Sequence, residues 1–203
     1  MVRVGQPSGT RLVGPWQFVR PFLFLSFAFA ISIFLHELGH HLFGVPSALG
    51  LAENYPLVPV SQANRTTEII GTIAGPAVNL LLTYIGLLGC KLASEESATH
   101  KFWWYVGTAN AFLTISAAVV NLIVDLASGT RGNDLELVST LMGLNVFILP
   151  AVFSLLSFFP LRTFLKEFAE VRDKYGAVLA LIAAWFISGG TLKLLDSMFH
   201  IRL

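Results

Sequence analysis

Charged residues are scarce in this sequence. Only 12% of its 203 residues are Asp, Glu, Lys or Arg, about half the fraction found in an average soluble domain. Hydrophobic residues make up 55% of the chain, and the mean hydropathy is +0.71. This composition predicts an integral membrane protein in contact with the lipid bilayer. The formal net charge is only +1, which argues against a nucleic acid as a partner.

Cysteine is nearly absent as well. The single residue of this type, Cys90, cannot form a disulfide within the chain. The first twenty residues also lack the pattern of a cleaved signal peptide, a short apolar core followed by small residues at the cleavage site. The first long apolar run begins at Pro21, and we expect it to remain in the membrane as an anchor.

The sequence is instead rich in long apolar runs. A helix needs about 20 apolar residues to cross the hydrocarbon core of a bilayer. Runs that reach or approach this length cover 21–45, 69–90, 102–124, 137–161 and 176–192, and the last can extend if Lys193 reaches the headgroups. The segment 162–175 mixes charged and apolar residues and is a candidate for a helix along the membrane surface. The sequence therefore predicts an all-α, multi-pass membrane protein with about five spans, in one membrane domain over 1–203.

The stretch FLHELGHHLFG, residues 34–44, places ionisable groups inside the first span. Each such group costs about 2.5 kcal/mol or more at the centre of a membrane helix, so its presence points to a function. HELGH fits the HExxH pattern with His36, Glu37 and His40. Residues four apart share one face of a helix, so both imidazoles can bind one metal ion, while the glutamate can accept a proton from water at the metal. Zinc suits this set, and we expect one zinc ion per chain.

Other interpretations of these histidines are less well supported. Two histidines could simply hydrogen-bond to neighbouring helices, and a bis-histidine haem needs ligands on facing helices rather than on one helix. His41 lies about 100° from His40 around the helix, so we do not expect it to be a ligand. A metal sensor or carrier would need more ligands along a path through the membrane, whereas His100 and His200 are isolated.

A catalytic zinc ion usually has three protein ligands and one open position, so a third ligand is expected. The histidines lie near the exit end of the first span, and the Gly-rich loop after the third span returns to the same membrane face. This region offers Asp125, Asp134 and Glu136. Asp134 also suits the N-terminus of a helix, where a carboxylate is favourable, whereas Asp125 ends the third span, where it is unfavourable. On these grounds, Asp125 and Asp134 are nearly equal candidates for the third ligand.

Three motifs resemble the site-2 protease family of intramembrane zinc metalloproteases. They are HELGH in a membrane helix, GPAVN in the following helix, and NLIV…ND from Asn121 to Asp134. The last is similar to that family's Asn-x-x-Pro segment followed by an Asp-Gly pair, in which the aspartate binds zinc. The resemblance covers roughly residues 34–135, about half of the chain, and implies that Asp134 is the third zinc ligand.

Asn79 and Asn121 are polar residues at membrane depth, and each has two interpretations. Asparagine often joins two membrane helices through a hydrogen bond. In the resembled family, asparagines at such positions are thought to bind the substrate backbone, and Gly75 and Pro76 would make room beside the metal. We take both asparagines as candidate substrate-binding residues.

The resemblance implies an intramembrane zinc metalloprotease with its catalytic core at about 21–136 and additional helices at 137–203. Its partner would be a membrane protein whose transmembrane segment is cleaved, with Glu37 as the general base. Val124 stands where the family usually has proline, and Leu135 where it usually has glycine. These departures motivate a second hypothesis, a catalytically weak scaffold or regulator that binds membrane helices. No PDZ-type insertion is present.

The distribution of Lys and Arg predicts the orientation in the membrane. With five spans, nine of the 13 residues fall on the side of the N-terminus and four on the other side. The positive-inside rule then places the N-terminus in the cytoplasm and the metal site toward the outer or lumenal face. The family resemblance implies the opposite orientation, and we follow the charge count.

Overall fold

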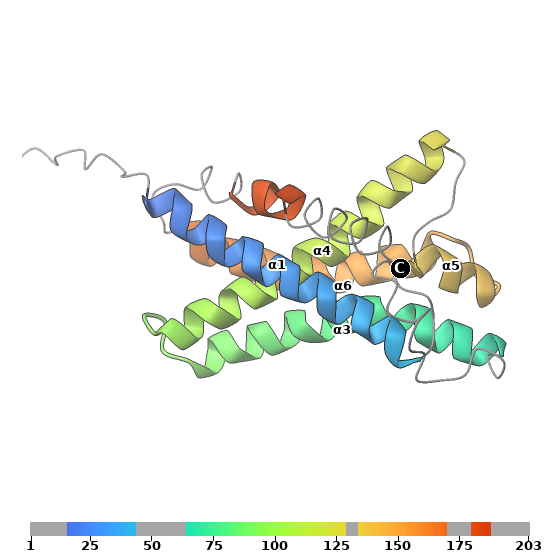
Figure 1. Cartoon of the computed structure of the whole chain (residues 1–203), viewed down its shortest axis with the longest axis horizontal. Helices are drawn as coiled ribbons and strands as arrows, with labels where there is room; N and C mark the ends of the chain where they lie inside the picture. The colour runs from blue at the N-terminus through green and yellow to red at the C-terminus, as the bar shows by residue number, and fades with distance from the viewer. Residues whose placement is uncertain (1–15, 44–63, 129–133, 170–179, 188–203) are drawn as a thin grey trace, which may run out of the picture.

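Every element of the structure is a helix (Figure 1). The computed structural model describes residues 16–43, 64–128, 134–169 and 180–187. Its elements are α1 (Trp16–Leu42), α3 (Arg65–Leu92), α4 (Ala98–Ser128), α5 (Asp134–Leu141) and α6 (Ile148–Ala169), and residues 180–187 are also helical. No strand occurs in the described ranges. The prediction of an all-α fold is confirmed for this part of the chain.

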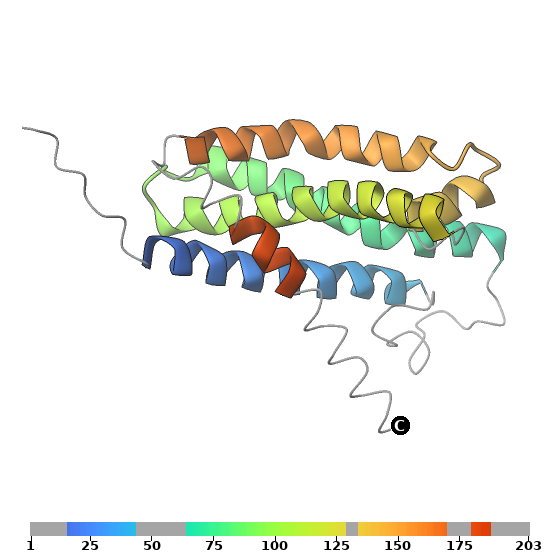
Figure 2. The ribbon, with the colours of Figure 1, turned by 90° about the horizontal axis from the view of Figure 1, so that it is seen from above.

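Four long helices lie roughly side by side and form the body of the molecule (Figure 2). The pair α3 and α4 lies in the middle, with α1 against both helices on one side and α6 against both on the other. The short helix α5 packs against α3 and α6 at one end. The chain direction alternates from α1 to α3, α4 and α6, so the end of α1, the start of α3 and helix α5 gather at the same end of the bundle.

Three of the described helices are long and apolar enough to cross a membrane: Val19–Leu42, Arg65–Leu92 and Ile148–Glu167. Their outward faces carry large exposed apolar side chains, including Leu23, Phe27, Leu81, Leu88, Leu155 and Phe159. An apolar exterior of this kind is unfavourable in water and suits contact with lipid. The chain is therefore a membrane protein, as its composition predicts.

Small and polar residues fill much of the interior between the helices. Gly86 and Gly107 bring α3 and α4 together, because a Cβ on Gly86 would lie 2.6 Å from the Cα of Gly107. Fully buried polar side chains, among them Thr72, Thr108 and Asn110, accompany Phe29 and Phe164 in the core. Such close contacts between small residues are typical of helix packing in membranes, where dispersion forces and interhelical hydrogen bonds replace the hydrophobic effect.

The prediction of a single span over 137–161 is wrong. Helix α5 ends at Leu141, and α6 begins at Ile148 and continues to Ala169. Gly143 has a φ of 71°, the Leu144 N–H donates to the Ser139 carbonyl at 2.8 Å, and the Gly143 N–H donates to the Thr140 carbonyl at 3.0 Å. This is the glycine-terminated end of a helix known as a Schellman motif. The apolar count did not detect it, because the turn is itself largely apolar.

The remaining expected spans have mixed outcomes. The run 102–124 lies within α4, but α4 is not one of the three described helices that meet the length and apolarity of a span. The expected surface segment begins inside α6, which carries Arg162 and Lys166 in the same continuous helix. Of the run 176–192, only 180–187 falls within the described residues, where it is helical. A total of five spans is therefore not confirmed.

Candidate metal centre

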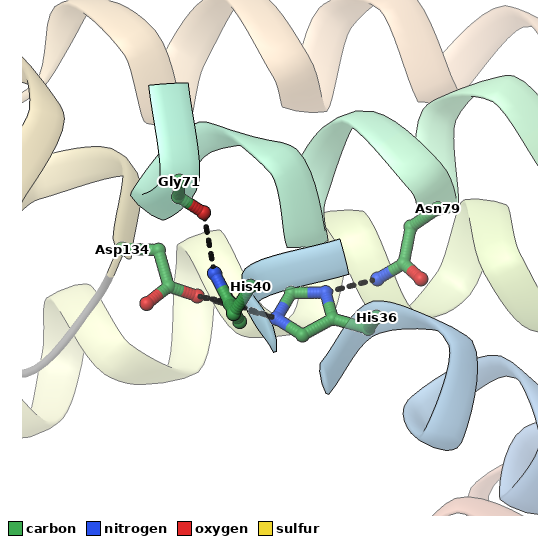
Figure 3. Close-up of polar contacts among 5 residues, drawn as sticks. All are labelled: His36, His40, Gly71, Asn79 and Asp134. Atoms are coloured by element: carbon green, nitrogen blue, oxygen red, sulfur yellow. Dashed lines mark hydrogen bonds and ion pairs between the residues drawn. The ribbon is translucent and has the colours of Figure 1, made fainter. Parts of the chain in front are cut away.

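Three side chains predicted as metal ligands meet at one end of the bundle (Figure 3). His36 and His40 come from the last turns of α1, and Asp134 is the first residue of α5, 98 residues after His36. The two imidazole Nε2 atoms lie 3.1 Å apart. The Asp134 Oδ2 atom lies 3.2 Å from Nε2 of His36 and 3.4 Å from Nε2 of His40. The three atoms thus form a nearly equilateral triangle.

The size of this triangle can be compared with a zinc site. Zinc binds nitrogen and oxygen at about 2.0–2.1 Å in tetrahedral geometry, so neighbouring ligand atoms lie about 3.3 Å apart. The observed separations of 3.1, 3.2 and 3.4 Å bracket this value. His36, His40 and Asp134 therefore have the spacing of one face of a zinc tetrahedron.

A hydrogen bond to α3 determines the tautomer of His40. Its Nδ1 lies 2.8 Å from the carbonyl oxygen of Gly71. A carbonyl only accepts, so Nδ1 carries the hydrogen and donates, and the neutral ring has its lone pair on Nε2. This lone pair points at His36 and at the carboxylate of Asp134. Either a cation or the Nε2–H of His36 has to lie between these groups, and a hydrogen bond from the outer ring nitrogen is typical of a metal-binding histidine.

Asn79 contacts the outer ring nitrogen of His36, as the Gly71 carbonyl contacts that of His40. Its side-chain amide lies 3.1 Å from Nδ1 of His36, and its Oδ1 atom is buried without a hydrogen-bond partner. The oxygen and nitrogen of an amide are assigned from the hydrogen-bond network. If the amide is turned over, Oδ1 accepts from the Nδ1–H of His36, and Nε2 is left with a lone pair for a metal. Asn79 thus contacts a predicted ligand directly, and its substrate-binding role stays a prediction.

Glycine residues allow α1 and α3 to approach at the centre. A Cβ on Gly75 would lie 2.8 Å from Nε2 of His36 and closer still to Nε2 of His40. On the opposite helix, a Cβ on Gly39 would lie 3.0 Å from the backbone of Ala74. The two imidazoles thus leave no space for a side chain at position 75, so glycine is required there. Helix α3 continues through Pro76 as one helix.

The centre is buried on the side of α1 and open on the side of α5. Glu37 is 8% exposed and His40 is 4% exposed, whereas the side chain of Asp134 is 38% exposed. Asp134 lies outside the three candidate spans. Burial opposes ionisation of its carboxyl, but the hydrogen bonds with His36 and His40 outweigh burial and lower the pKa of Asp134 below its ordinary value. The carboxylate form, which binds metals, is therefore favoured.

The structure gives less information on the other predicted site residues. Asn121 and Asp125 lie in α4, but their side chains are outside the described part of the structure. Glu136, the third acidic candidate, is 3% exposed within α5. The sequence did not predict the hydrogen bond between His40 and the Gly71 carbonyl. Every residue has a backbone carbonyl, so no side-chain pattern distinguishes this one.

Comparisons of the chain with protein-family models, curated proteins and solved structures find no match.

Proposed function

We propose that the protein is a multi-pass intramembrane zinc metalloprotease that cleaves membrane-embedded segments of other proteins. The observation that carries this proposal is the triangle of His36 Nε2, His40 Nε2 and Asp134 Oδ2, with edges of 3.1–3.4 Å. A zinc ion held there would supply Lewis acidity toward a carbonyl oxygen and would activate water.

The ligand number supports a catalytic rather than a purely structural zinc site. Structural zinc sites usually have four protein ligands, whereas catalytic sites have three and leave one position open. Among the described residues, the metal-capable group at this end of the bundle has three members. The side chain of Asp134 is 38% exposed, so a ligand of the proposed zinc ion is accessible from the side of α5.

Glu37 supplies the proton acceptor that peptide hydrolysis requires. It lies between the two histidines in the sequence of α1 and is almost completely buried. Its carboxylate would accept a proton from the attacking water and pass it to the leaving amine. Gly71 and Asn79 hold the two imidazoles in place, so the groups around the reacting carbonyl are largely preorganised.

The membrane setting supports a membrane-embedded protein segment as the substrate. The centre lies on the last turns of α1, within the candidate span Val19–Leu42. A peptide bond inside a helix is hydrogen-bonded and shielded, so a transmembrane substrate has to unwind locally to reach the site. Helix-breaking residues in a substrate span should therefore promote cleavage.

The test uses purified protein in lipid vesicles with a panel of transmembrane reporter peptides. Glu37→Gln should retain zinc and helical content but lose cleavage by about 100-fold or more, because the amide cannot accept the proton. Glu68→Gln, which changes an exposed carboxylate on α3, is the matched control and should cleave normally.

Cleavage by Glu37→Gln within a few-fold of the wild-type rate would contradict the general-base role. Tight binding of the reporters by the wild type without any cleavage would contradict the protease proposal and would support the scaffold hypothesis.

A further inference from the structure

A second group of metal-binding side chains lies at the other end of the bundle. Cys90 is near the end of α3, His100 is in the first turn of α4, and Glu167 is near the end of α6. These helix ends lie together, away from α5 and the last turns of α1 (Figure 2). The sulfur, one imidazole nitrogen and one carboxylate oxygen all lie within 4.8 Å of one another. We propose that these three residues form a second zinc site.

The hydrogen bonds of His100 orient its ring for this role. Nδ1 of His100 lies 3.0 Å from the carbonyl oxygen of Cys90 and must donate to it. In the neutral ring, Nε2 then presents a lone pair to Oε2 of Glu167, only 3.1 Å away. Two acceptors face each other unless a proton or a metal ion lies between them. The same pattern occurs at His40, where the outer nitrogen donates to a backbone carbonyl and the inner one faces a carboxylate.

The chemistry of the three groups selects zinc among the common divalent ions. Thiolate, imidazole and carboxylate are all zinc ligands, whereas magnesium and calcium prefer oxygen alone. In a tetrahedral site the sulfur lies about 3.5 Å from a neighbouring nitrogen or oxygen, so atoms that lie within 4.8 Å of one another have to approach by at most about 1.3 Å. Nε2 of His100 and Oε2 of Glu167 are already 3.1 Å apart, so the movement has to bring the Cys90 sulfur toward them, and Glu167, whose side chain is 41% exposed, can follow it.

By its position in the fold, zinc at this site would link three helices, and a water molecule would complete the tetrahedron that the three protein ligands leave open. Residues 93–97 form the short connection between α3 and α4, and the three ligands come from three different helices. Zinc bound there would join the α3–α4 hairpin to α6. This inference uses none of the residues of the His36 centre and does not depend on the proposed protease activity.

The alternative is a hydrogen-bonded His100–Glu167 pair beside an uninvolved thiol, since the Cys90 sulfur also lies 3.6 Å from the His100 carbonyl. The two possibilities differ in whether sulfur binds the metal. Cys90 is the single cysteine of the chain, so a thiolate-to-cobalt charge-transfer band can come from this site alone. Metal binding would also release the thiol proton to solvent.

The experiment loads the full-length, metal-free protein with Co²⁺ in detergent and records the near-ultraviolet spectrum. The charge-transfer band should appear in the wild type and in His36→Ala, and should be absent in Cys90→Ser. With zinc, Cys90→Ser should hold one ion fewer per chain than the wild type, whether or not the His36 centre is occupied.

Two further variants keep the inference testable if Cys90→Ser does not fold. Glu167→Gln, at an exposed position, should weaken cobalt binding at the thiolate site by about 10-fold or more. Glu95→Gln, an exposed carboxylate in the α3–α4 connection, should leave it unchanged. A cobalt-loaded wild type without the charge-transfer band, or with the same cobalt affinity in Glu167→Gln as in Glu95→Gln, would overturn the second site.

Discussion

At the scale of single residues, each imidazole of the candidate metal centre has one nitrogen facing α3 and one facing the other two proposed ligands. His40 donates to Gly71, and His36 lies beside the amide of Asn79. These partners hold the rings in place, and the loss of such a partner typically weakens metal binding by about 10–100-fold. Asn79 therefore influences the centre through His36, whether or not it also contacts a substrate.

The third ligand can be tested by comparing the two aspartates that the sequence left nearly equal. Asp134→Ala should weaken zinc binding at the His36 centre by more than about 100-fold, because it removes a proposed direct ligand. Asp125→Ala should change it little. The measurement is zinc affinity in the Cys90→Ser background, which removes the thiolate of the second group. Zinc loss in Asp125→Ala with normal binding in Asp134→Ala would contradict the assignment.

At the scale of the helices, the centre depends on how closely α1 and α3 pack. Gly75 of α3 faces both imidazoles, and Gly39 of α1 faces the backbone of α3. A side chain at either position would separate the helices or displace the rings, and overpacking of this kind typically costs about 1–3 kcal/mol. The GPAVN segment thus contributes space through Gly75 and a ring partner through Asn79.

Gly75→Ala should abolish zinc binding at the His36 centre while the protein keeps its helical content. The added Cβ would lie 2.8 Å or less from both Nε2 atoms, so the triangle cannot form without displacement of the rings. Gly86→Ala is the matched control on the same helix, because it crowds Gly107 of α4 rather than the histidines. It should lower thermal stability but retain zinc. Normal zinc affinity in Gly75→Ala would show that the imidazoles do not lie against α3 as described.

At the scale of the whole molecule, the positive charges are concentrated at one end of the bundle. The end away from the His36 centre carries Arg20, Lys91, Lys101, Arg162 and Lys166, and the end near the centre carries Arg65. These are the Lys and Arg residues within the described ranges. The positive-inside rule predicts that the first end lies in the cytoplasm and that the candidate metal centre lies toward the opposite face.

Accessibility labelling can test this orientation with single cysteines on a Cys90→Ala background. Ser94→Cys reports the connection between α3 and α4, and Leu144→Cys reports the turn between α5 and α6; both positions are exposed. A membrane-impermeant reagent added to intact cells should label position 144 and not position 94. Labelling of position 94 alone would contradict the charge argument and support the orientation implied by the site-2 protease resemblance.

Local patterns in the sequence were sufficient for several conclusions, because composition and helical spacing act over short distances. Low charge and long apolar runs predicted a helical membrane protein, and HELGH placed His36 and His40 on one face of a helix. The turn at Gly143, which follows α5, also has a local cause, a glycine with positive φ. The length of the apolar run nevertheless predicted one continuous span there.

Only the tertiary structure could bring Asp134 within 3.4 Å of both histidines, because 98 residues separate it from His36 and no local rule sets that distance. The same holds for the Gly71 carbonyl, a backbone group with no sequence signature, and for Cys90, His100 and Glu167, which are unrelated along the chain. These groups meet because the packing of α1, α3, α4 and α6 places helix ends together, and packing is a property of the whole chain rather than of any segment.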